Sequence, residues 1–154
     1  MVVVLAALLA GRFVRWPSDA LQYDGRQVSV ARVLGPDRID VHAPDRKDQL
    51  VPVRLIGVAA GDAASAPASD WLRHACDGQT LTLTMDPRRP GRDDEGALCA
   101  FVYRADGSLL NEQIIEQGLA ASRPNASHRL SIWFARLEGW ARDRGSGQWA
   151  DAGQ

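Results

Sequence analysis

The chain has 154 residues, which is the length of one ordinary domain. Hydrophobic residues make up 45% of it and charged residues 24%, which allows a single core and excludes a disordered, collagen-like or disulfide-stapled chain. The 18 basic and 19 acidic residues give a net charge of −1, so no overall positive field attracts nucleic acid. Cys76 and Cys99 lack zinc-site and CxxC spacing and are expected to be free thiols in the core.

Residues 1–16 form an apolar amino-terminal segment. Its nine consecutive apolar residues, 2–10, would span about 14 Å as a helix, roughly half of a ~30 Å hydrocarbon core. Arg12, Arg15 and Trp16 follow and are typical of an interfacial anchor. We therefore expect residues 2–16 to anchor the chain to a membrane, with the domain on the cytoplasmic or matrix side. A cleaved signal peptide, which implies export, and a packed terminus are the alternatives.

Residues 17–26 are polar and are predicted to connect this segment to a domain spanning residues 27–150. The domain begins with three short runs of strand periodicity, in which apolar residues alternate with others. These apolar residues are Val28 and Val30, then Ile39 and Val41, then Val51, Val53 and Leu55. Residues 35–37 predict a turn between the first two runs. Pro52 indicates that the third strand has a free edge at that point.

A helix, two strands and two further helices are predicted in the rest of the chain. Pro67 indicates the start of the first helix, and alternation over residues 80–85 predicts the next strand. Residues 98–103 are apolar on both faces, which is typical of a central strand. Residues 110–119 and 130–141 show helical periodicity, with Trp133 and Trp140 at core spacing. The three histidines, which share no ligand spacing, are expected on the surface.

The predicted order is β-β-β-α-β-β-α-α, without a repeat or a linker. This order fits an α+β fold, namely a five-stranded Greek-key barrel of the OB type with three helices. Several short stretches add a family resemblance to this order. They are Val53-Arg54-Leu55-Ile56-Gly57-Val58, Cys99-Ala100-Phe101-Val102-Tyr103, Asp106-Gly107-Ser108-Leu109-Leu110-Asn111-Glu112, Gln117-Gly118-Leu119-Ala120 and Gly147-Gln148-Trp149. With the element order, they resemble a staphylococcal-nuclease-like (thermonuclease) domain over about residues 28–149.

The resemblance implies a calcium-dependent nuclease site for DNA and RNA, of which this chain keeps only a part. In such a site carboxylates hold the cation, a further carboxylate activates water and two arginines bind the phosphate. Carried over by position, Asp37 is a metal carboxylate and Arg54 is a phosphate arginine. Asp62 stands where the family has the water-activating glutamate, one methylene longer.

Other positions of the family's site carry alanine in this chain. Ala59 replaces the second metal carboxylate, Ala60 follows it in the same run, and Ala97 replaces the second phosphate arginine. Losing one transition-state donor costs a factor of about 10²–10³ in rate. The alternative is that the loop at 86–96 restores the site. It would then bring Arg92 to the phosphate in place of the missing arginine, and Asp93 or Asp94 to the metal.

We therefore predict a non-catalytic domain that serves as a structural or protein-binding module, as an accessory subunit of a membrane-associated assembly. No cofactor is expected, and calcium would be bound only if the domain were active. The alternatives are a calcium-dependent nuclease and a non-enzymatic single-strand nucleic-acid binder, which the net charge does not favour. In the structural interpretation, Asp37 is a turn residue and Arg54 pairs with Asp37 or Asp62. The positive charge of the arginines at 88, 89 and 92 is expected to be nearly cancelled by the negative charge of the acids at 93–95.

Overall fold

The computed structural model describes residues 19–43, 48–59, 61, 65–123 and 126–150. The apolar segment 2–16 therefore lies outside the described residues. Within the part that is described, no helix combines the length and the apolar character needed to cross a membrane.

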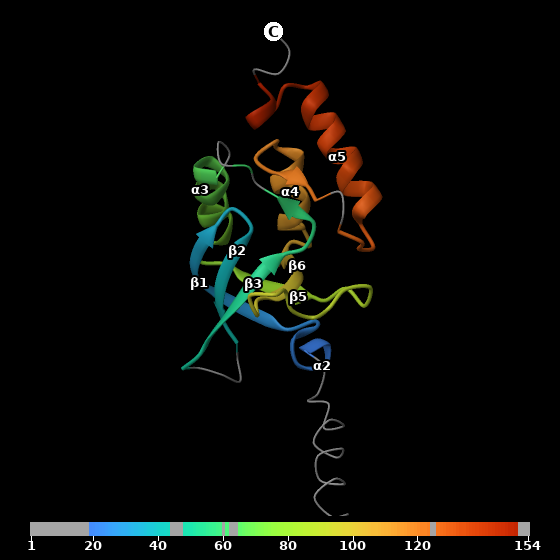
Figure 1. Ribbon diagram of the computed structural model, residues 1–154. Coiled ribbons are helices and arrows are strands. Elements are labelled where there is room, and N and C mark those ends of the chain that lie inside the picture. The colour runs from blue at the N-terminus through green and yellow to red at the C-terminus, as the bar shows by residue number, and fades with distance from the viewer. Residues whose placement is uncertain (1–18, 44–47, 60, 62–64, 124–125, 151–154) are drawn as a thin grey trace, which may run out of the picture.

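Five strands close into one barrel (Figure 1). They are β1 (Gln27–Gly35), β2 (Arg38–His42), β3 (Leu50–Leu55), β5 (Thr80–Thr84) and β6 (Leu98–Arg104). Their order around the barrel is β1-β2-β3-β6-β5, and β5 pairs with β1 to close it. The β3–β6 pair is parallel and the other pairs are antiparallel. The prediction of an α+β fold built on a five-stranded barrel is thus confirmed.

The pairing register separates the side chains that fill the barrel from those on its outer surface. Val53 pairs with Leu98 in the β3–β6 ladder, and both side chains are 0% exposed. Because successive side chains of a strand point to opposite faces, Arg54 and its partner Cys99 lie on the outer surface. Phe101 shares this outer face of β6 with Cys99. The β3–β6 pairing begins only at Val53, which confirms the free edge predicted at Pro52.

Helices cover both ends of the barrel (Figure 1). The helix α3 (Ser65–Cys76) connects β4 to β5, and α4 (Leu110–Glu116) and α5 (Ser131–Asp143) follow β6. A two-stranded sheet of β4 (Val58–Ala59) and β7 (Ala121–Ser122) joins them, and the 3₁₀ helix η2 (Gly147–Trp149) comes last. The count of three helices was too low, since the described residues form four α-helices. The fourth, α2 (Asp19–Tyr23), lies within the predicted connector.

Burial confirms most of the predicted core and corrects it at two positions. The largest fully buried side chains are Tyr23, Phe101, Phe134, Ile39, Leu55, Leu72, Leu81, Leu83, Leu98, Leu110, Ile114 and Ile115. Cys76 and Cys99 are free and buried, as predicted. Trp140 does not belong to the core, because it is 43% exposed. His128 is only 2% exposed, in contrast to the surface position expected for it, whereas His42 and His74 are exposed.

Candidate functional site

The predicted site residues Asp37 and Arg54 meet on the outer surface of the barrel, where Arg54 is surrounded by carboxylates. Its Nε donates to Asp93 Oδ2 at 2.7 Å and its Nη1 donates to Asp37 Oδ2 at 3.1 Å. Its Nη2 lies 3.5 Å from Glu95 Oε1. The side chains of Arg54, Asp37 and Asp93 are 21%, 16% and 16% exposed. Arg54 therefore pairs with Asp37 as the structural interpretation predicted, and it gains two further acidic partners.

The register of β2 and β3 explains why so many acids gather here. Arg38 lies directly opposite Arg54 in the antiparallel pair, and like charges at such positions repel each other. Asp93 and Glu95 relieve this repulsion, because Arg38 Nη2 lies 3.3 Å from Asp93 Oδ2 and Arg38 Nη1 lies 2.6 Å from Glu95 Oε2. The hydrogen bond that Arg38 donates to Glu95 is the main reason that the pKa of Arg38 is raised, and burial opposes this shift.

Arg123 completes the group from the segment after β7, with its Nη2 3.6 Å from Asp37 Oδ2. The six residues Asp37, Arg38, Arg54, Asp93, Glu95 and Arg123 are called the Arg54 cluster below. Three positive and three negative side chains make the cluster neutral as a whole. Its pairs connect β2, β3 and the loop between β5 and β6, so its first consequence is structural.

Asp93 is the centre of the cluster, since each of its carboxylate oxygens has partners. Oδ1 accepts the amides of Glu95 at 3.0 Å and Ala97 at 2.9 Å, which fixes the loop, while Oδ2 faces the two arginines. Burial alone raises the pKa of Asp93. The amide hydrogen bonds and the charge of Arg54 outweigh burial and hold this pKa below its usual value. Asp93 is therefore an ionised anchor of the cluster.

Of the other predicted site residues that the structure describes, Ala97 contributes only its backbone amide to the cluster, as a donor to Asp93 Oδ1. Ala97 is 1% exposed and Ala59 ends β4. Ala60 and Asp62 lie outside the described residues. Arg92, considered as a replacement for the missing phosphate arginine, instead binds Asp19 of α2 at 2.9 Å and the carbonyl of Gly96 at 2.8 Å.

Sequence reasoning missed the roles of Arg38 and Arg123, and it considered Asp93 only as a possible metal ligand or, with Glu95, as a partner of the arginines at 88, 89 and 92. The outward phase of residues 38 and 54 on adjacent strands was the available signal, because it predicts two arginines side by side. Among the described residues, no group of three or more His, Cys, Asp or Glu side chains is arranged to hold a metal ion. A cation at Asp37 would also meet the guanidinium groups of Arg54 and Arg123.

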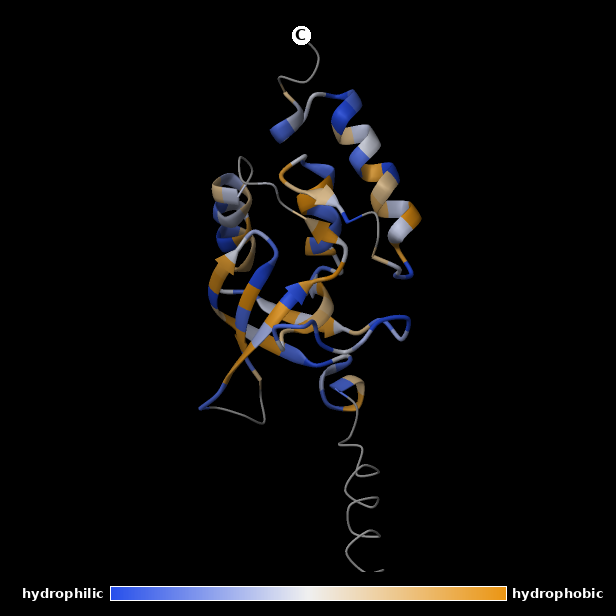
Figure 2. Cartoon of the chain, in the orientation of Figure 1, coloured by the Kyte–Doolittle hydropathy of each residue, from blue (hydrophilic) through white to orange (hydrophobic). Residues whose placement is uncertain are grey.

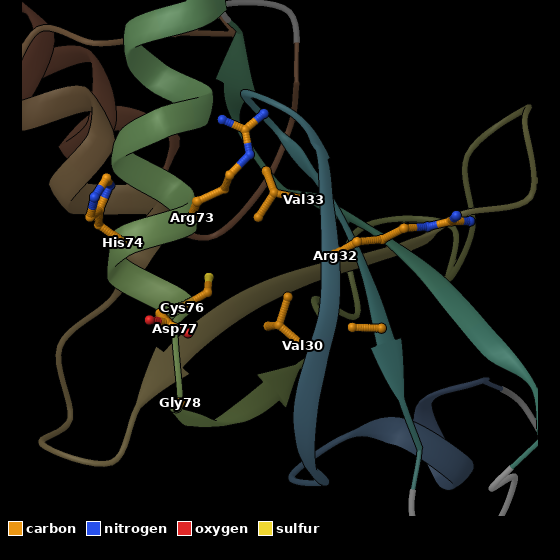
Figure 3. A pocket seen from close by; sticks show the side chains of 9 residues that line it. Val30, Arg32, Val33, Arg73, His74, Cys76, Asp77 and Gly78 are labelled. Carbon is orange, nitrogen blue, oxygen red and sulfur yellow. The ribbon is translucent and has the colours of Figure 1, made fainter.

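A separate groove of about 510 Å³ lies between β1 and α3 (Figure 3). Val30 and Val33 face it from β1, and Cys76 faces it from α3. Its two arginines already have partners, since Arg32 pairs with Asp40 at 2.7 Å and Arg73 pairs with Asp70. None of its lining residues belongs to the Arg54 cluster, so the groove is independent of the predicted site.

Buried His128 predicts a pH-dependent stability. Its ring packs on Phe101 and Phe134, with centroids 5.7 and 5.1 Å away, and its Nδ1 accepts the amide of Leu130 at 3.2 Å. Burial lowers the pKa of His128, although the charge of Asp86 opposes the shift. The unfolded chain therefore takes up a proton more readily, and stability should fall as the pH drops below about 6.5.

This dependence can be measured by urea unfolding of the wild type and of His128→Gln between pH 7.5 and 5. The variant should lose less stability over this interval than the wild type. His74→Gln is the matched control, because His74 is exposed and should leave the pH profile unchanged. Equal slopes for all three proteins would show that the buried imidazole is not the titrating group.

The family resemblance receives no independent support from known proteins. No protein-family model matches the chain, and no curated protein has a significantly similar sequence. The function therefore has to be inferred from the geometry described above.

Proposed function

We propose that the domain is an OB barrel of the staphylococcal-nuclease type that has no nuclease activity and serves as a structural, protein-binding module. The strand order supports the OB type, because a helix separates the third and fourth barrel strands and the third pairs in parallel with the fifth. The further proposal, that it is an accessory subunit of a membrane-associated assembly, rests on the apolar residues 2–16.

One observation carries the absence of activity, namely that Arg54 is already occupied. A nuclease needs this arginine free to bind a phosphate and to stabilise the charge that develops on it. Here three carboxylates surround its guanidinium, from Asp37, Asp93 and Glu95. A phosphate would have to displace them, and it would also be repelled by their charge. The arginine contributes to the fold instead of to chemistry.

The alanines at 59 and 97 support the same conclusion from the side of the metal and the transition state. At the two positions where the resemblance places a carboxylate and an arginine, the side chain ends at Cβ. Asp37 alone cannot supply the 6–8 oxygen ligands that calcium prefers, and its Oδ2 faces Arg54 and Arg123. No resident cofactor is proposed.

The outer face of α5 supports the protein-binding part of the proposal. Ile132 is 80% exposed and Trp140, eight positions later on the same face, is 43% exposed. Trp140 packs edge-on against Trp133, with ring centroids 5.6 Å apart. Exposed aromatic and aliphatic side chains of this kind are typical of the centre of a protein–protein interface.

The absence of activity is tested by incubating the full chain with denatured DNA and RNA in millimolar calcium. We expect no cleavage above the background of a mock preparation. The control is Arg54→Lys, which retains a positive charge but loses the planar guanidinium group that can donate two parallel hydrogen bonds to a phosphate. Calcium-dependent cleavage by the wild type that Arg54→Lys abolishes would refute the proposal and favour the nuclease alternative. Salt-sensitive retention of an oligonucleotide without cleavage would favour the nucleic-acid binder.

The partner is sought by affinity purification of the tagged full chain from the membranes of cells that naturally express it. A stoichiometric partner should be recovered with the wild type and lost with Ile132→Glu. Leu34→Glu is the matched control, because Leu34 is also an exposed aliphatic side chain but lies on β1. Equal recovery with both variants would show that the outer face of α5 is not the interface.

A further inference from the structure

Arg88, Arg89 and Arg129, which lie outside the Arg54 cluster, form a second basic group. The acids at 93–95 were predicted to cancel the charge of the first two, but Asp93 and Glu95 pair with other arginines. Arg88, Arg89 and Arg129 form no ion pair with a carboxylate within the part of the chain that is described. Positive charge therefore remains next to a neutral cluster.

Asp86 brings two of these arginines together from distant parts of the chain. Its Oδ1 accepts the amide of Arg88 at 2.9 Å, and its Oδ2 accepts the amide of Arg129 at 2.7 Å. The loop after β5 and the turn before α5 consequently lie side by side, and both are hydrophilic (Figure 2). Asp86 is 4% exposed and its carboxylate accepts these two backbone amides, whereas the residues Arg88 and Arg129 are themselves exposed.

The guanidinium groups of Arg89 and Arg129 stand over neighbouring outward residues of β6. Arg129 lies above the Phe101 ring, with its Cζ 4.8 Å from the ring centroid, and Arg89 lies beside the Cys99 thiol. Alternate residues on a strand are about 6–7 Å apart. The two arginines therefore approach the same short stretch of β6 from two different segments of the chain. The Nε of Arg89 is also buried without a hydrogen-bond partner among the described residues.

We propose that Arg89 and Arg129, assisted by Arg88, bind the terminal phosphate of a phosphate monoester. Guanidinium groups donate two parallel hydrogen bonds to phosphate oxygens, and two such forks match a dianion. With Asp86 included, the group has a surplus of positive charge, which a dianion would balance. The site is independent of the proposed function, since it uses neither the Arg54 cluster nor the outer face of α5.

A nucleic-acid backbone fits this surface less well than a monoester does. The whole chain has a net charge of −1, so no overall positive field favours the extended backbone of a nucleic acid. Phe101 is 0% exposed and cannot stack on a base. The phosphate can come from a soluble ester or from a lipid headgroup, and both present the same dianion.

The site is tested by NMR titration of the ¹⁵N-labelled full chain with glycerol 3-phosphate at constant ionic strength. We expect saturable shifts of the amides near residues 88, 89 and 129. The double variant Arg89→Gln/Arg129→Gln should weaken binding at least tenfold. Arg129→Lys tests whether the paired hydrogen bonds of the guanidinium group matter. It should weaken binding although the positive charge is retained. Arg136→Gln is the matched control, because Arg136 is an exposed arginine of α5 without an ion pair among the described residues.

A second arm uses vesicles containing phosphatidate, with phosphatidylcholine vesicles as the blank. Loss of phosphatidate binding in the double variant, with little binding of the soluble ester, would assign the site to a lipid headgroup. Binding of the soluble ester alone would assign it to a small metabolite. If the wild type binds neither ligand, or if the double variant binds both as well as the wild type does, the proposal is overturned. Binding of a single-stranded oligonucleotide in preference to both would also overturn it.

Discussion

Replacing Asn111 with alanine is expected to lower the free energy of unfolding by about 3–4 kcal/mol. Asn111 is 0% exposed, in the first turn of α4. Its Oδ1 accepts the amide of Val102 at 2.9 Å, and its Nδ2 donates to the carbonyls of Ile56 and Ala100 at 3.0 and 3.2 Å. One side chain thus joins α4, β6 and the turn after β3. Alanine would leave these backbone groups buried without that partner, and urea unfolding would measure the loss.

Two comparisons separate this hydrogen-bond effect from a loss of helix propensity or volume. Asn111→Asp keeps the shape of the side chain and its acceptor oxygen, but it loses the Nδ2 group that donates both hydrogen bonds. At neutral pH this variant should therefore be destabilised by a large part of the amount expected for Asn111→Ala. Glu116→Ala changes an exposed side chain of the same helix and should alter stability by less than about 0.5 kcal/mol. If Asn111→Ala were as mild as Glu116→Ala, the amide would not be the connection that the geometry indicates.

Asn111 also illustrates what the sequence could predict. The barrel was predictable because its apolar residues alternate, as at Leu81 and Leu83, and alternation depends only on local periodicity. The helix that starts at Leu110 follows a turn at residues 106–107, and its place after β6 was predictable for the same reason. Family resemblance singled out the Asn-Glu pair, but only the structure reveals that Asn111 satisfies backbone groups on two other elements.

The features that escaped sequence analysis depend on contacts between residues far apart in the chain. Residues 17–26 look like a polar connector, yet Tyr23 is 2% exposed because it packs into the core. Arg92 pairs with Asp19, which is 73 positions away. His128 looks like a solvated residue until Phe101 and Phe134 enclose it. No local pattern encodes these partners, so periodicity cannot predict them.

The candidate site divides along the same line. Asp37 and Arg54 were identified by position and do lie together, because the turn after β1 and the strand β3 are adjacent in the barrel. The acids that occupy Arg54 come from residues 93 and 95, in a loop whose conformation could not be derived from composition. The sequence therefore predicted that Asp37 and Arg54 lie together, whereas the ion pairs of Arg54 with residues 93 and 95 emerged only from the structure.

The ion pairs that occupy Arg54 lead to the second prediction of a large loss of stability. Asp93→Ala is expected to lower the free energy of unfolding by about 3 kcal/mol at pH 7. The change removes the acceptor for the amides of Glu95 and Ala97. It also leaves Arg38 and Arg54, opposed on neighbouring strands, with only the more exposed of their two shared carboxylates, that of Glu95. Urea unfolding measures this loss, and the melting temperature should fall with it.

The difference in the free energy of unfolding between the wild type and Asp93→Ala should depend on pH. This dependence measures how much the ionised form of Asp93 stabilises the fold. Because the pKa of Asp93 is lowered in the folded state, its ionised form stabilises the fold above the ordinary carboxyl range, and this contribution disappears as the pH falls through the lowered pKa. The gap between wild type and Asp93→Ala should therefore narrow below about pH 4. Asp94→Ala is the matched control, since Asp94 is the exposed neighbour and should change stability by less than about 0.5 kcal/mol at any pH. A gap that stays constant down to pH 3 would contradict the lowered pKa, because it would mean that the ionised form of Asp93 does not stabilise the fold.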